Sequence, residues 1–419
     1  MYEIWPEMAL KGIHSPKSAI KAERSMCSSR RKKSMIKWST SVTMLVLTQS
    51  WCANGADSAT GLIPLDAKIP VSSSIDNRGL RIFEDKMQIK SGKVQYGYLI
   101  NKSHMTLDCQ GATLDGGGKI PTAVLIESNG EPLEDIIVKN CIFKNFKYNG
   151  IRVGWSIKDA LKYSIHKGDL YQYHPSNILI QNVSVLDSGT VGVYVDDYVS
   201  NVRVLNSEVL NSGYVGVYFE FSSKDNTIKD SLISHNGHGR LINGVRNNIR
   251  REGVSIDSSE SNVISGNVFS DNATGSIFLY KNCQEQVTKG GSVKRILGAS
   301  SNIIKDNKFF NEKIGVWIAS RQSRDLKNWD CGDSSIYQGR FFLDYADENT
   351  VQNNKFCNVE KGVIVEGDKN NVVENTFKGR FSEGVFQPIT ARQKYLNRPP
   401  VGNVYENNSV YKNIPCGSE

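Results

Sequence analysis

The chain has 419 residues, of which 39% are hydrophobic and 22% are charged, with 36 glycines and 11 prolines. This composition excludes a disordered tail protein, a collagen and a small disulfide-stapled module. The net charge is +8, and residues 1–56 account for +6 of it, with nine Lys and Arg against three Asp and Glu. The rest of the chain has 42 basic and 40 acidic residues, or +2. Bulk charge therefore does not indicate a nucleic acid partner.

The N-terminal segment has the pattern of a secretory signal peptide. Four basic residues at 30–33 precede a mostly apolar run at 38–47, and small residues follow at 53–56. A charged start, a short apolar middle and a small-residue end are typical of an export signal. The apolar run is shorter than a membrane span of roughly 20 residues. We expect residues 1–56 to be a leader, with Met35 as an alternative start, and the mature protein to be secreted or periplasmic. A buried N-terminal helix is the alternative interpretation.

Six cysteines follow the leader, and none belongs to a C-x-x-C pair. They are Cys109, Cys141, Cys283, Cys331, Cys357 and Cys416. This spacing does not favour zinc binding or thioredoxin-like chemistry. An even number in an exported chain allows disulfides whose connectivity stays open, and free cysteines in an apolar core are the alternative.

One phrase recurs along most of the chain. It consists of an Asn, alternating apolar residues, a second Asn five positions later and then an aromatic or aliphatic residue. Copies begin at Asn177, Asn201, Asn262, Asn302, Asn349, Asn370 and Asn403, with weaker copies at Asp135 and Asn226. Most copies are followed by a glycine and an alternating strand, as at 192–197 and 216–220. The copies are 21 to 47 residues apart, which predicts two or three short strands per unit with loop insertions.

This repeat predicts an all-β fold, a parallel β-helix. Alternation places Val193 and Val195 on one side of a strand and Tyr194 and Asp196 on the other. No unit can bury its apolar side alone, so the units must stack. Asparagines recurring at one turn position predict an internal ladder of side-chain amides. We expect the β-helix to occupy residues 101–419 and an N-terminal cap to occupy residues 57–100.

The sequence also resembles a known family of folds. The phrase Leu-Asp-Cys-Gln-Gly-Ala-Thr-Leu-Asp-Gly beginning at Leu107, and the recurring Asn-x-Ile-x-x-Asn-x-Phe, look like the right-handed parallel β-helix of pectate-lyase-like proteins. The resemblance covers about residues 100–415 and implies a right-handed solenoid. It leaves the activity open, because this scaffold hosts lyases, hydrolases, epimerases and phage tailspikes.

The outward residues of the glycine-led strands predict a groove that binds a chain of sugars. About nine coils at ~4.8 Å per coil would give a groove roughly 40 Å long. Aromatic side chains stack on sugar faces, and carboxylates bind hydroxyls or a Ca²⁺ ion, which is the one cofactor we consider. The predicted substrate-binding residues are Tyr194, Tyr218, Arg251, Tyr280 and Trp317, and the predicted metal ligands are Asp196, Glu220 and Asp257. Solvated outward side chains are the simpler interpretation of the same positions.

Two basic residues suggest a reaction. Lys281 and Arg321 are one repeat unit apart, so we expect them to be neighbours in adjacent coils. β-Elimination of a uronate needs a base for the C5 proton, a cation for the carboxylate and an acid for the leaving oxygen. The arrangement is similar to lyases of the alginate lyase and chondroitinase B type, which implies Lys281 as base and Arg321 as acid. That family has His-Gly after its Arg, whereas Gln322 and Ser323 follow here, and its acidic calcium run is not plainly reproduced.

Other functions stay open at this point. Asp196-Asp197 and Gly237-His238-Gly239 resemble motifs of polygalacturonases, in which paired carboxylates hydrolyse the glycosidic bond. A uronate C5-epimerase would share the first step of the lyase, although its Asp-Pro-His-Asp phrase is absent. A non-catalytic glycan-binding protein would need the aromatic strip alone. The leading hypothesis is an exported lyase whose partner is an acidic polysaccharide.

Overall fold

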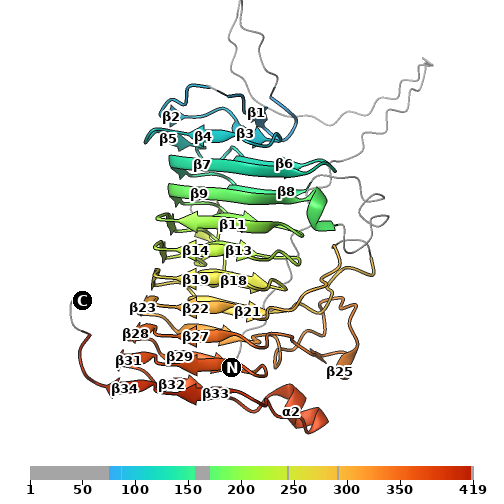
Figure 1. Cartoon of the computed structure of the whole chain (residues 1–419), viewed down its shortest axis with the longest axis vertical. Coiled ribbons are helices and arrows are strands. Elements are labelled where there is room, and N and C mark those ends of the chain that lie inside the picture. Colours follow the sequence, from blue (N-terminus) through green and yellow to red (C-terminus); the bar gives the residue numbers. More distant parts are fainter. Residues whose placement is uncertain (1–74, 86, 156–169, 243–244, 290–291, 417–419) are drawn as a thin grey trace, which may run out of the picture. The chain divides into compact units, whose positions relative to one another are not determined.

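The computed structural model describes residues 75–85, 87–155, 170–242, 245–289 and 292–416. Stacked coils of short strands form a parallel β-helix with its N-terminal coils at one end and its C-terminal coils at the other (Figure 1). The leader predicted at 1–56 lies outside the described residues, as does the first part of the predicted cap. Later in that cap segment, three strands, at 80–82, 92–93 and 97–100, are part of the stacked coils and pair in register with strands that follow. The boundary at residue 101 stays a prediction.

The first sheet has eleven parallel strands, one per coil. In order they are β1 (Leu80–Ile82), β3 (Gly97–Ile100), β6 (Thr122–Ser128), β8 (Asn149–Trp155), β10 (Val193–Val195), β13 (Val217–Phe219), β18 (Val254–Asp257), β21 (Ile277–Tyr280), β24 (Ile314–Ile318), β29 (Lys361–Val365) and β32 (Glu383–Phe386). Pairing in register stacks equivalent residues, so that Arg152 adjoins Tyr194 and Tyr194 adjoins Tyr218. The outward row predicted from the sequence is therefore confirmed as one continuous row.

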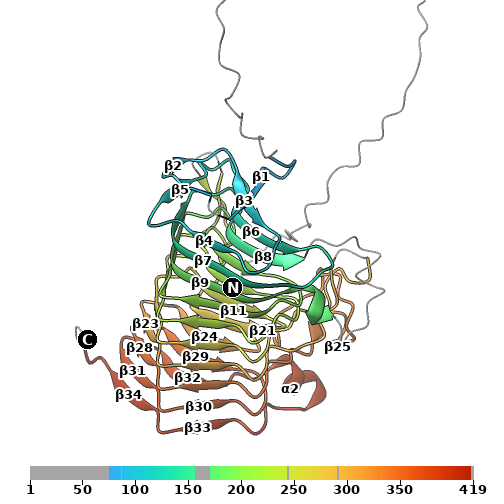
Figure 2. The same ribbon diagram turned by 45° about the horizontal axis from the view of Figure 1, so that its top comes forward.

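The other two faces are built from the rest of each coil, and long strands β7 (Leu133–Lys144) and β9 (Pro175–Leu186) run through both. One face consists of β4 (Thr106–Asp108), β11 (Ser200–Leu205), β14 (Thr227–Lys229), β19 (Val263–Ser265), β22 (Ile303–Lys305), β27 (Thr350–Gln352), β30 (Asn371–Val373) and β33 (Val404–Glu406). The other consists of β2 (Gly92–Lys93), β5 (Thr113–Asp115), β12 (Glu208–Leu210), β15 (Leu232–Ser234), β20 (Val268–Ser270), β23 (Lys308–Phe310), β28 (Lys355–Cys357), β31 (Thr376–Gly379) and β34 (Ser409–Lys412). The turned view in Figure 2 shows these faces enclosing a common interior.

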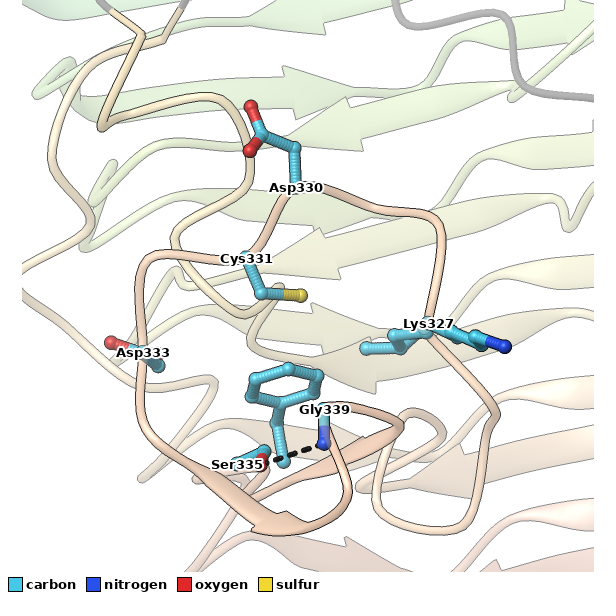
Figure 3. A pocket seen from close by; sticks show the side chains of 8 residues that line it. Lys327, Asp330, Cys331, Asp333, Ser335 and Gly339 are labelled. Carbon is cyan, nitrogen blue, oxygen red and sulfur yellow. Dashed lines mark hydrogen bonds between the residues drawn. The ribbon is translucent and has the colours of Figure 1, made fainter.

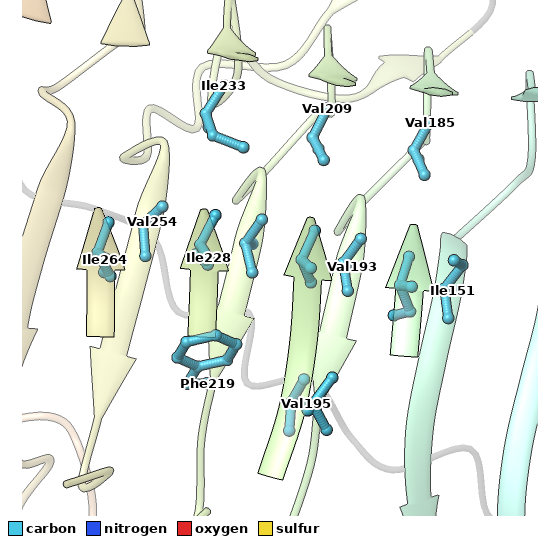
Figure 4. Close-up of a cluster of buried hydrophobic side chains, with 14 of the residues drawn as sticks. Ile151, Val185, Val193, Val195, Val209, Phe219, Ile228, Ile233, Val254 and Ile264 are labelled. Atoms are coloured by element: carbon cyan, nitrogen blue, oxygen red, sulfur yellow. The ribbon is translucent and has the colours of Figure 1, made fainter. Parts of the chain in front are cut away.

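The interior is filled by the inward residues of all three faces. Figure 4 shows side chains such as Ile151, Val193 and Ile228 converging from facing strands, and all three are buried. One column contains stacked phenylalanines, Phe269, Phe309, Phe356 and Phe377, with ring centroids 5.0, 4.6 and 4.8 Å apart. Like residues can stack this way because each coil repeats the backbone of the previous one.

The predicted asparagine ladder is present at the corners between faces. The Asn262 side-chain amide donates to Oδ1 of Asn302 at 2.7 Å, and Asn302 donates in the same way to Asn349 at 3.0 Å. Each oxygen also accepts the backbone N–H of the Asn one coil earlier. These bonds satisfy buried amides that would otherwise cost free energy.

The earliest copies of the repeat occupy a different position from the one predicted. Asn177, Asn182, Asn201 and Asn206 have φ near +50° and lie one residue before the ladder position, where Val202 and Ser207 donate their backbone N–H to the next coil. In the later coils this left-handed position is taken by the residue before the ladder Asn, such as Asp225 or Ser261. Asn tolerates left-handed backbone. The same residue type therefore occurs at both the left-handed position and the ladder position, and the sequence pattern does not distinguish the two.

All six cysteines after the leader form disulfides: Cys109–Cys141, Cys283–Cys331 and Cys357–Cys416. The second joins two long insertions that leave the coils after β21 and β24. Further elements in insertions are η1 (Leu170–Tyr173), the antiparallel pairs β16 (Leu241–Ile242) with β17 (Val245–Arg246) and β25 (Ser335–Tyr337) with β26 (Phe341–Phe342), and helix α2 (Ala391–Leu396). No helix in the described part of the chain is long and apolar enough to cross a membrane.

Candidate functional site: an arginine layer over the first sheet

The aromatic side chains on the outward side of the first sheet are covered rather than open, both in the row of Tyr194 and Tyr218 and at Tyr280, which is in register with Asp257. Tyr194, Tyr218 and Tyr280 are 7%, 5% and 0% exposed. An arginine lies over each ring: Arg152 is 5.2 Å from the centroid of Tyr194, Arg251 is 5.9 Å from that of Tyr218, and Arg321 is 3.6 Å from that of Tyr280. These cation–π contacts occupy ring faces that the sequence predicted would stack on sugars. The outer layer over Tyr194 and Tyr218 is therefore guanidinium, from the half-buried Arg152 and Arg251, whereas Arg321 is itself buried.

The three predicted metal ligands are engaged by arginines. Asp196 accepts hydrogen bonds from the Arg152 side chain. The buried Arg295, which sequence reasoning missed, donates to Oε1 of Glu220 at 3.2 Å and to Oδ2 of Asp257 at 3.4 Å. Asp257 also accepts bonds from the backbone and side chain of Asn282.

These contacts do not fit a calcium site at Asp196, Glu220 and Asp257. Ca²⁺ binds roughly six to eight oxygen ligands, whereas here a buried guanidinium supplies the positive charge. Burial and the neighbouring Asp257 raise the pKa of Glu220 to about 8 despite Arg295. A carboxyl already bonded to a guanidinium is a poor ligand for a hard cation.

Arg251, Glu252 and Tyr280 form a hydrogen-bonded group at the start of β18 and the end of β21. Arg251 donates to Oε2 of Glu252 at 3.2 Å and to the Tyr280 hydroxyl at 3.1 Å, and that hydroxyl donates to Oε1 of Glu252 at 3.3 Å. Burial would raise the pKa of Glu252, but Arg251 and Arg321 lower it to about 2. Burial raises the pKa of Tyr280 to about 12. At neutral pH Glu252 is thus an anion and Tyr280 a phenol.

Arg321 and Arg324 lie beside this group and lack carboxylate partners among the described residues. Arg321 Nε donates to Oδ1 of Asn282 at 3.2 Å. Arg324 is 5.0 Å from the centroid of Trp329. Burial, together with the charges of Arg321 and Arg251, lowers the pKa of Arg324 to about 9. Among the described residues, Glu252 is the one carboxylate that forms an ion pair with these three guanidiniums, while Glu285 and Asp344 lie close enough to interact with Arg321 electrostatically.

Lys281 and Arg321 are neighbours in adjacent coils, as expected from their spacing. The backbone N–H of Lys281 donates to Oδ1 of Asp344 at 2.6 Å, and that of Arg321 donates to Oδ2 at 2.8 Å. The Lys281 ammonium forms an ion pair with Oδ2 of Asp333, 3.1 Å away. Asp344 had no sequence signal, because it comes from a non-repeating insertion. A neighbouring carboxylate favours the ammonium form of a lysine, and only the neutral amine can accept a proton.

Trp317 lies further along the same row. Its ring meets Phe278 edge to face at 5.3 Å, and its Nε1 donates to Oε1 of Glu366 at 2.9 Å. Burial raises the pKa of Glu366 to about 6, although this bond and one from Ser323 lower it. Trp317 is half-buried, so its outer surface remains available to a ligand.

A separate cavity of about 270 Å³ lies inside the insertion after β24 (Figure 3). It is lined by Leu326, Lys327, Asp330, Cys331, Asp333, Ser335, Gly339 and Phe342. Neither Arg321 nor Tyr280 is among its lining residues. It adjoins the site only through Asp333 and the disulfide at Cys331.

Two family models match the chain. The model described as "Right handed beta helix region" matches residues 121–323, and the model described as "Periplasmic copper-binding protein (NosD)" matches residues 294–415. The first match and the stacked parallel strands identify a right-handed parallel β-helix protein, which confirms the predicted fold. No curated protein sequence matches the chain.

Solved structures whose backbone follows a similar path include carbohydrate-active proteins. The A-module of mannuronan C-5 epimerase AlgE4 from Azotobacter vinelandii is 12% identical, with 81% of this chain and 89% of that chain covered and a TM-score of 0.44. An alginate lyase from Paenibacillus sp. str. FPU-7 is 11% identical, with 77% and 91% covered and a TM-score of 0.31. DFA-IIIase from Arthrobacter chlorophenolicus A6 is 11% identical, with 76% and 75% covered and a TM-score of 0.44. At these values the similarities carry no information on the activity of this chain.

The residues do not fit copper binding in the segment that matches NosD. Residues 294–415 contain no His and no Met, and their two cysteines, Cys331 and Cys357, are in disulfides. Soft or imidazole ligands for copper are therefore missing there. Among the described residues, one group has metal-like spacing, namely His104, Glu134 and Asp135. All three are exposed; Glu134 and Asp135 lie in β7 and His104 precedes β4, away from the first sheet.

Proposed function

We propose that this chain is an exported enzyme that cleaves a uronate-containing acidic polysaccharide by β-elimination. The observation that carries the proposal is the cluster of Arg251, Arg321 and Arg324, in which only Arg251 has a carboxylate partner among the described residues. An anionic group of the substrate would supply the missing negative charge. Guanidiniums bind carboxylates through two parallel hydrogen bonds, and a uronate presents one carboxylate per sugar.

The same charge serves the chemistry of elimination. The C5 proton of a uronate becomes acidic when the attached carboxylate is neutralised, so fixed cations stabilise the carbanion-like transition state. The base takes the C5 proton, the electron pair forms the C4–C5 double bond, and the C4–O bond breaks as the leaving oxygen gains a proton. Two of the three required functions need cations or proton donors, which this cluster supplies.

We assign the base to Lys281 and the acid to Arg321. The support is their fixed proximity, since one carboxylate binds both backbone amides. Lys281 is ion-paired with Asp333, so its ammonium must first release a proton before the neutral amine can accept the C5 proton. Tyr280 is the second candidate, because its hydroxyl contacts both Arg251 and Glu252.

The hydrolase hypothesis receives less support than the lyase, whereas the epimerase hypothesis is not separated from it. The motif residue Asp196 is bonded by Arg152, and His238 contacts the backbone oxygen of Asp271 at 2.8 Å. The neighbouring carboxyls Glu220 and Asp257 are both ion-paired with the buried Arg295, which leaves them poorly suited to act on a glycosidic bond. An epimerase would use the same cluster and differ only in returning the proton to C5.

The disulfides are consistent with an exported protein. All six cysteines outside the leader are oxidised, and structural disulfides persist in secreted and periplasmic proteins. We infer that the mature protein works outside the cytoplasm, where extracellular polysaccharides are found.

The experiment is a measurement of ultraviolet absorbance from the unsaturated product. Purified mature protein would be mixed with alginate, polygalacturonate, glucuronan or chondroitin, with and without Ca²⁺. We expect absorbance to rise with one polymer, and Arg324→Gln to lower kcat/KM about tenfold to a hundredfold through loss of a charged contact. Lys305→Gln, on the exposed surface of β22, is the charge-matched control.

Other outcomes would replace the proposal. New reducing ends without absorbance would indicate a hydrolase, and inverted C5 configuration without cleavage would indicate an epimerase. Binding without any of these changes would leave a glycan-binding protein.

A further inference from the structure

A basic hairpin lies next to the arginine cluster and is not needed for the proposed chemistry. Residues 237–242 and 245–251 leave the coil between β15 and β18, and the sequence from 237 to 251 contains four arginines and no acidic residue. The hairpin includes the antiparallel pair β16–β17. Its last residue, Arg251, belongs to the cluster described above. The other three are Arg240, Arg246 and Arg250.

Internal contacts give this hairpin a defined shape. Nη1 of Arg250 donates to the backbone oxygens of His238, Asn247 and Ile249 at 2.8 to 3.1 Å. Oδ1 of Asn247 accepts the backbone N–H of Arg240 at 3.0 Å. Gly239 has φ +92°, and a Cβ there would lie 2.2 Å from the oxygen of Asn247. Arg250 is therefore a structural residue, and the hairpin depends on glycine at 239.

Arg240 and Arg246 are placed differently. The Arg240 guanidinium lies 5.2 Å from the ring centroid of Tyr148, and the Lys147 ammonium lies 5.1 Å from the same ring. Arg246 is exposed and donates to the oxygen of Gly239 at 2.9 Å. None of these three cations pairs with a carboxylate among the described residues. Their positive charge is therefore not neutralised by a carboxylate within the part of the chain that the structure describes.

These cations extend the basic surface along the helix axis. Tyr148 immediately precedes β8, and Arg251 precedes β18, with β10 and β13 between them. Three coil steps at ~4.8 Å separate the two positions by roughly 14 Å. That separation is too long for one sugar carboxylate to contact both places. A polymer with regularly spaced carboxylates can contact both at once.

We propose that Lys147, Arg240 and Arg246 form a second anion-binding surface that holds the acidic polysaccharide several sugars away from the Arg251–Arg321–Arg324 cluster. This inference rests on the proposed function for its substrate class. A second contact on the same chain acts as an intramolecular binding event, so it strengthens binding of polymers far more than binding of short oligosaccharides. The surface thereby selects for chain length.

The test compares long and short ligands with the double variant Arg240→Gln/Arg246→Gln. Affinity electrophoresis through gels containing alginate, polygalacturonate, glucuronan or chondroitin measures polymer binding without requiring turnover. Competition with size-fractionated di- and trisaccharides of the same polymer measures binding of short chains. We expect the preference for polymer over oligosaccharide to fall about tenfold in the double variant. Lys305→Gln should retain the wild-type preference, and thermal unfolding checks that each variant is folded.

The outcomes separate this inference from the proposed function. An unchanged preference in a folded double variant overturns the second surface. Polymer binding that falls in the double variant, in a protein without lyase activity, supports the surface and overturns the lyase. If the wild-type protein is not retarded by any uronate polymer, both proposals fail.

Discussion

Lys281 and Arg321 are bound through their backbone amides to the two oxygens of one carboxylate, that of Asp344. Asp344 is itself fixed by Gln322, whose side-chain oxygen accepts the Asp344 backbone N–H at 2.8 Å. The carboxylate of Asp344 thus joins the coil that ends at Lys281 to the coil that ends at Arg321. The relative position of the two proposed catalytic residues depends on a residue that contacts neither of their side-chain functional groups.

Asp344→Asn tests this positioning role. Asn can accept only one of the two N–H groups through its oxygen, and its NH₂ would face the other donor. Because a shift of about 1 Å can cost roughly a hundredfold in rate, we expect kcat to fall by about tenfold to a hundredfold with a smaller change in KM. Steady-state kinetics on the polymer identified above measures both. A purely structural role would lower stability and leave kcat of the folded variant unchanged.

The pH dependence of the wild type gives an independent check on Asp344. Burial raises its pKa to about 7, although the N–H groups of Lys281 and Arg321 lower it. Below that pH the carboxyl becomes protonated and loses acceptor capacity, so we expect kcat to decline as the pH falls through about 7. In Asp344→Asn this limb of the pH–rate profile should be missing.

Lys281→Ala and Tyr280→Phe identify the base. If Lys281 takes the C5 proton, its removal lowers kcat by roughly a hundredfold or more, the size of a general-base contribution. Tyr280→Phe should then cost less than about tenfold, because the ring beneath Arg321 remains. The reverse order of effects, measured by initial rates on one polymer, assigns proton removal to Tyr280.

The Cys283–Cys331 disulfide should matter for turnover as well as stability. It joins the two insertions that carry Lys281 and Arg321, alongside the Lys281–Asp333 ion pair. We expect Cys283→Ser/Cys331→Ser to lose about 2–4 kcal/mol of unfolding free energy and also to raise KM for polymer. The matched variant Cys357→Ser/Cys416→Ser removes the C-terminal disulfide. It should lose comparable stability in denaturant titrations, and an equal rise in its KM would contradict a local role for the first disulfide.

The buried carboxyl of Glu312 should make the free energy of unfolding depend on pH. It takes the third ladder position after Asn236 and Asn272, where its Oε1 accepts the side-chain amide of Asn272 at 2.7 Å. Burial raises its pKa to about 8, although the bonds from Asn272 lower it. Between the unfolded value of about 4.5 and about 8, the folded state binds a proton that the unfolded state has released. Stability therefore falls as pH rises through this window, by up to about 1.4 kcal/mol per pH unit.

Glu312→Gln should remove that loss, since the amide can still accept from Asn272 and does not ionise. Denaturant titrations at pH 5 and pH 8 are expected to show the variant gaining on the wild type as the pH rises. Glu360→Gln, an exposed carboxylate, is the control. A constant difference between variant and wild type at both pH values would show that Glu312 is ionised in the folded protein.

The features that recur in every coil could be predicted from the sequence, because they follow from the sequence repeat. Alternation of Val193, Tyr194 and Val195 defines which face is inside, and a stacked fold repeats that choice in every coil. The asparagine ladder and the neighbouring positions of Lys281 and Arg321 follow from the same repeat. The predicted ladder position was wrong by one residue at Asn177 and Asn201, because Asn suits both the left-handed corner and the ladder position.

The chemistry of the site was decided by the tertiary structure. Arg295, Asp344 and Arg240 come from insertions with no period, and their partners are distant in sequence, as with Arg295 and Glu220. The insertions place arginines over tyrosines and a guanidinium between carboxylates, which turns an expected sugar-stacking strip with a metal site into a cationic surface. A repeat determines the backbone of a coil and the direction of its side chains. What lies on top of those side chains depends on how each loop folds back, and only long-range packing determines that.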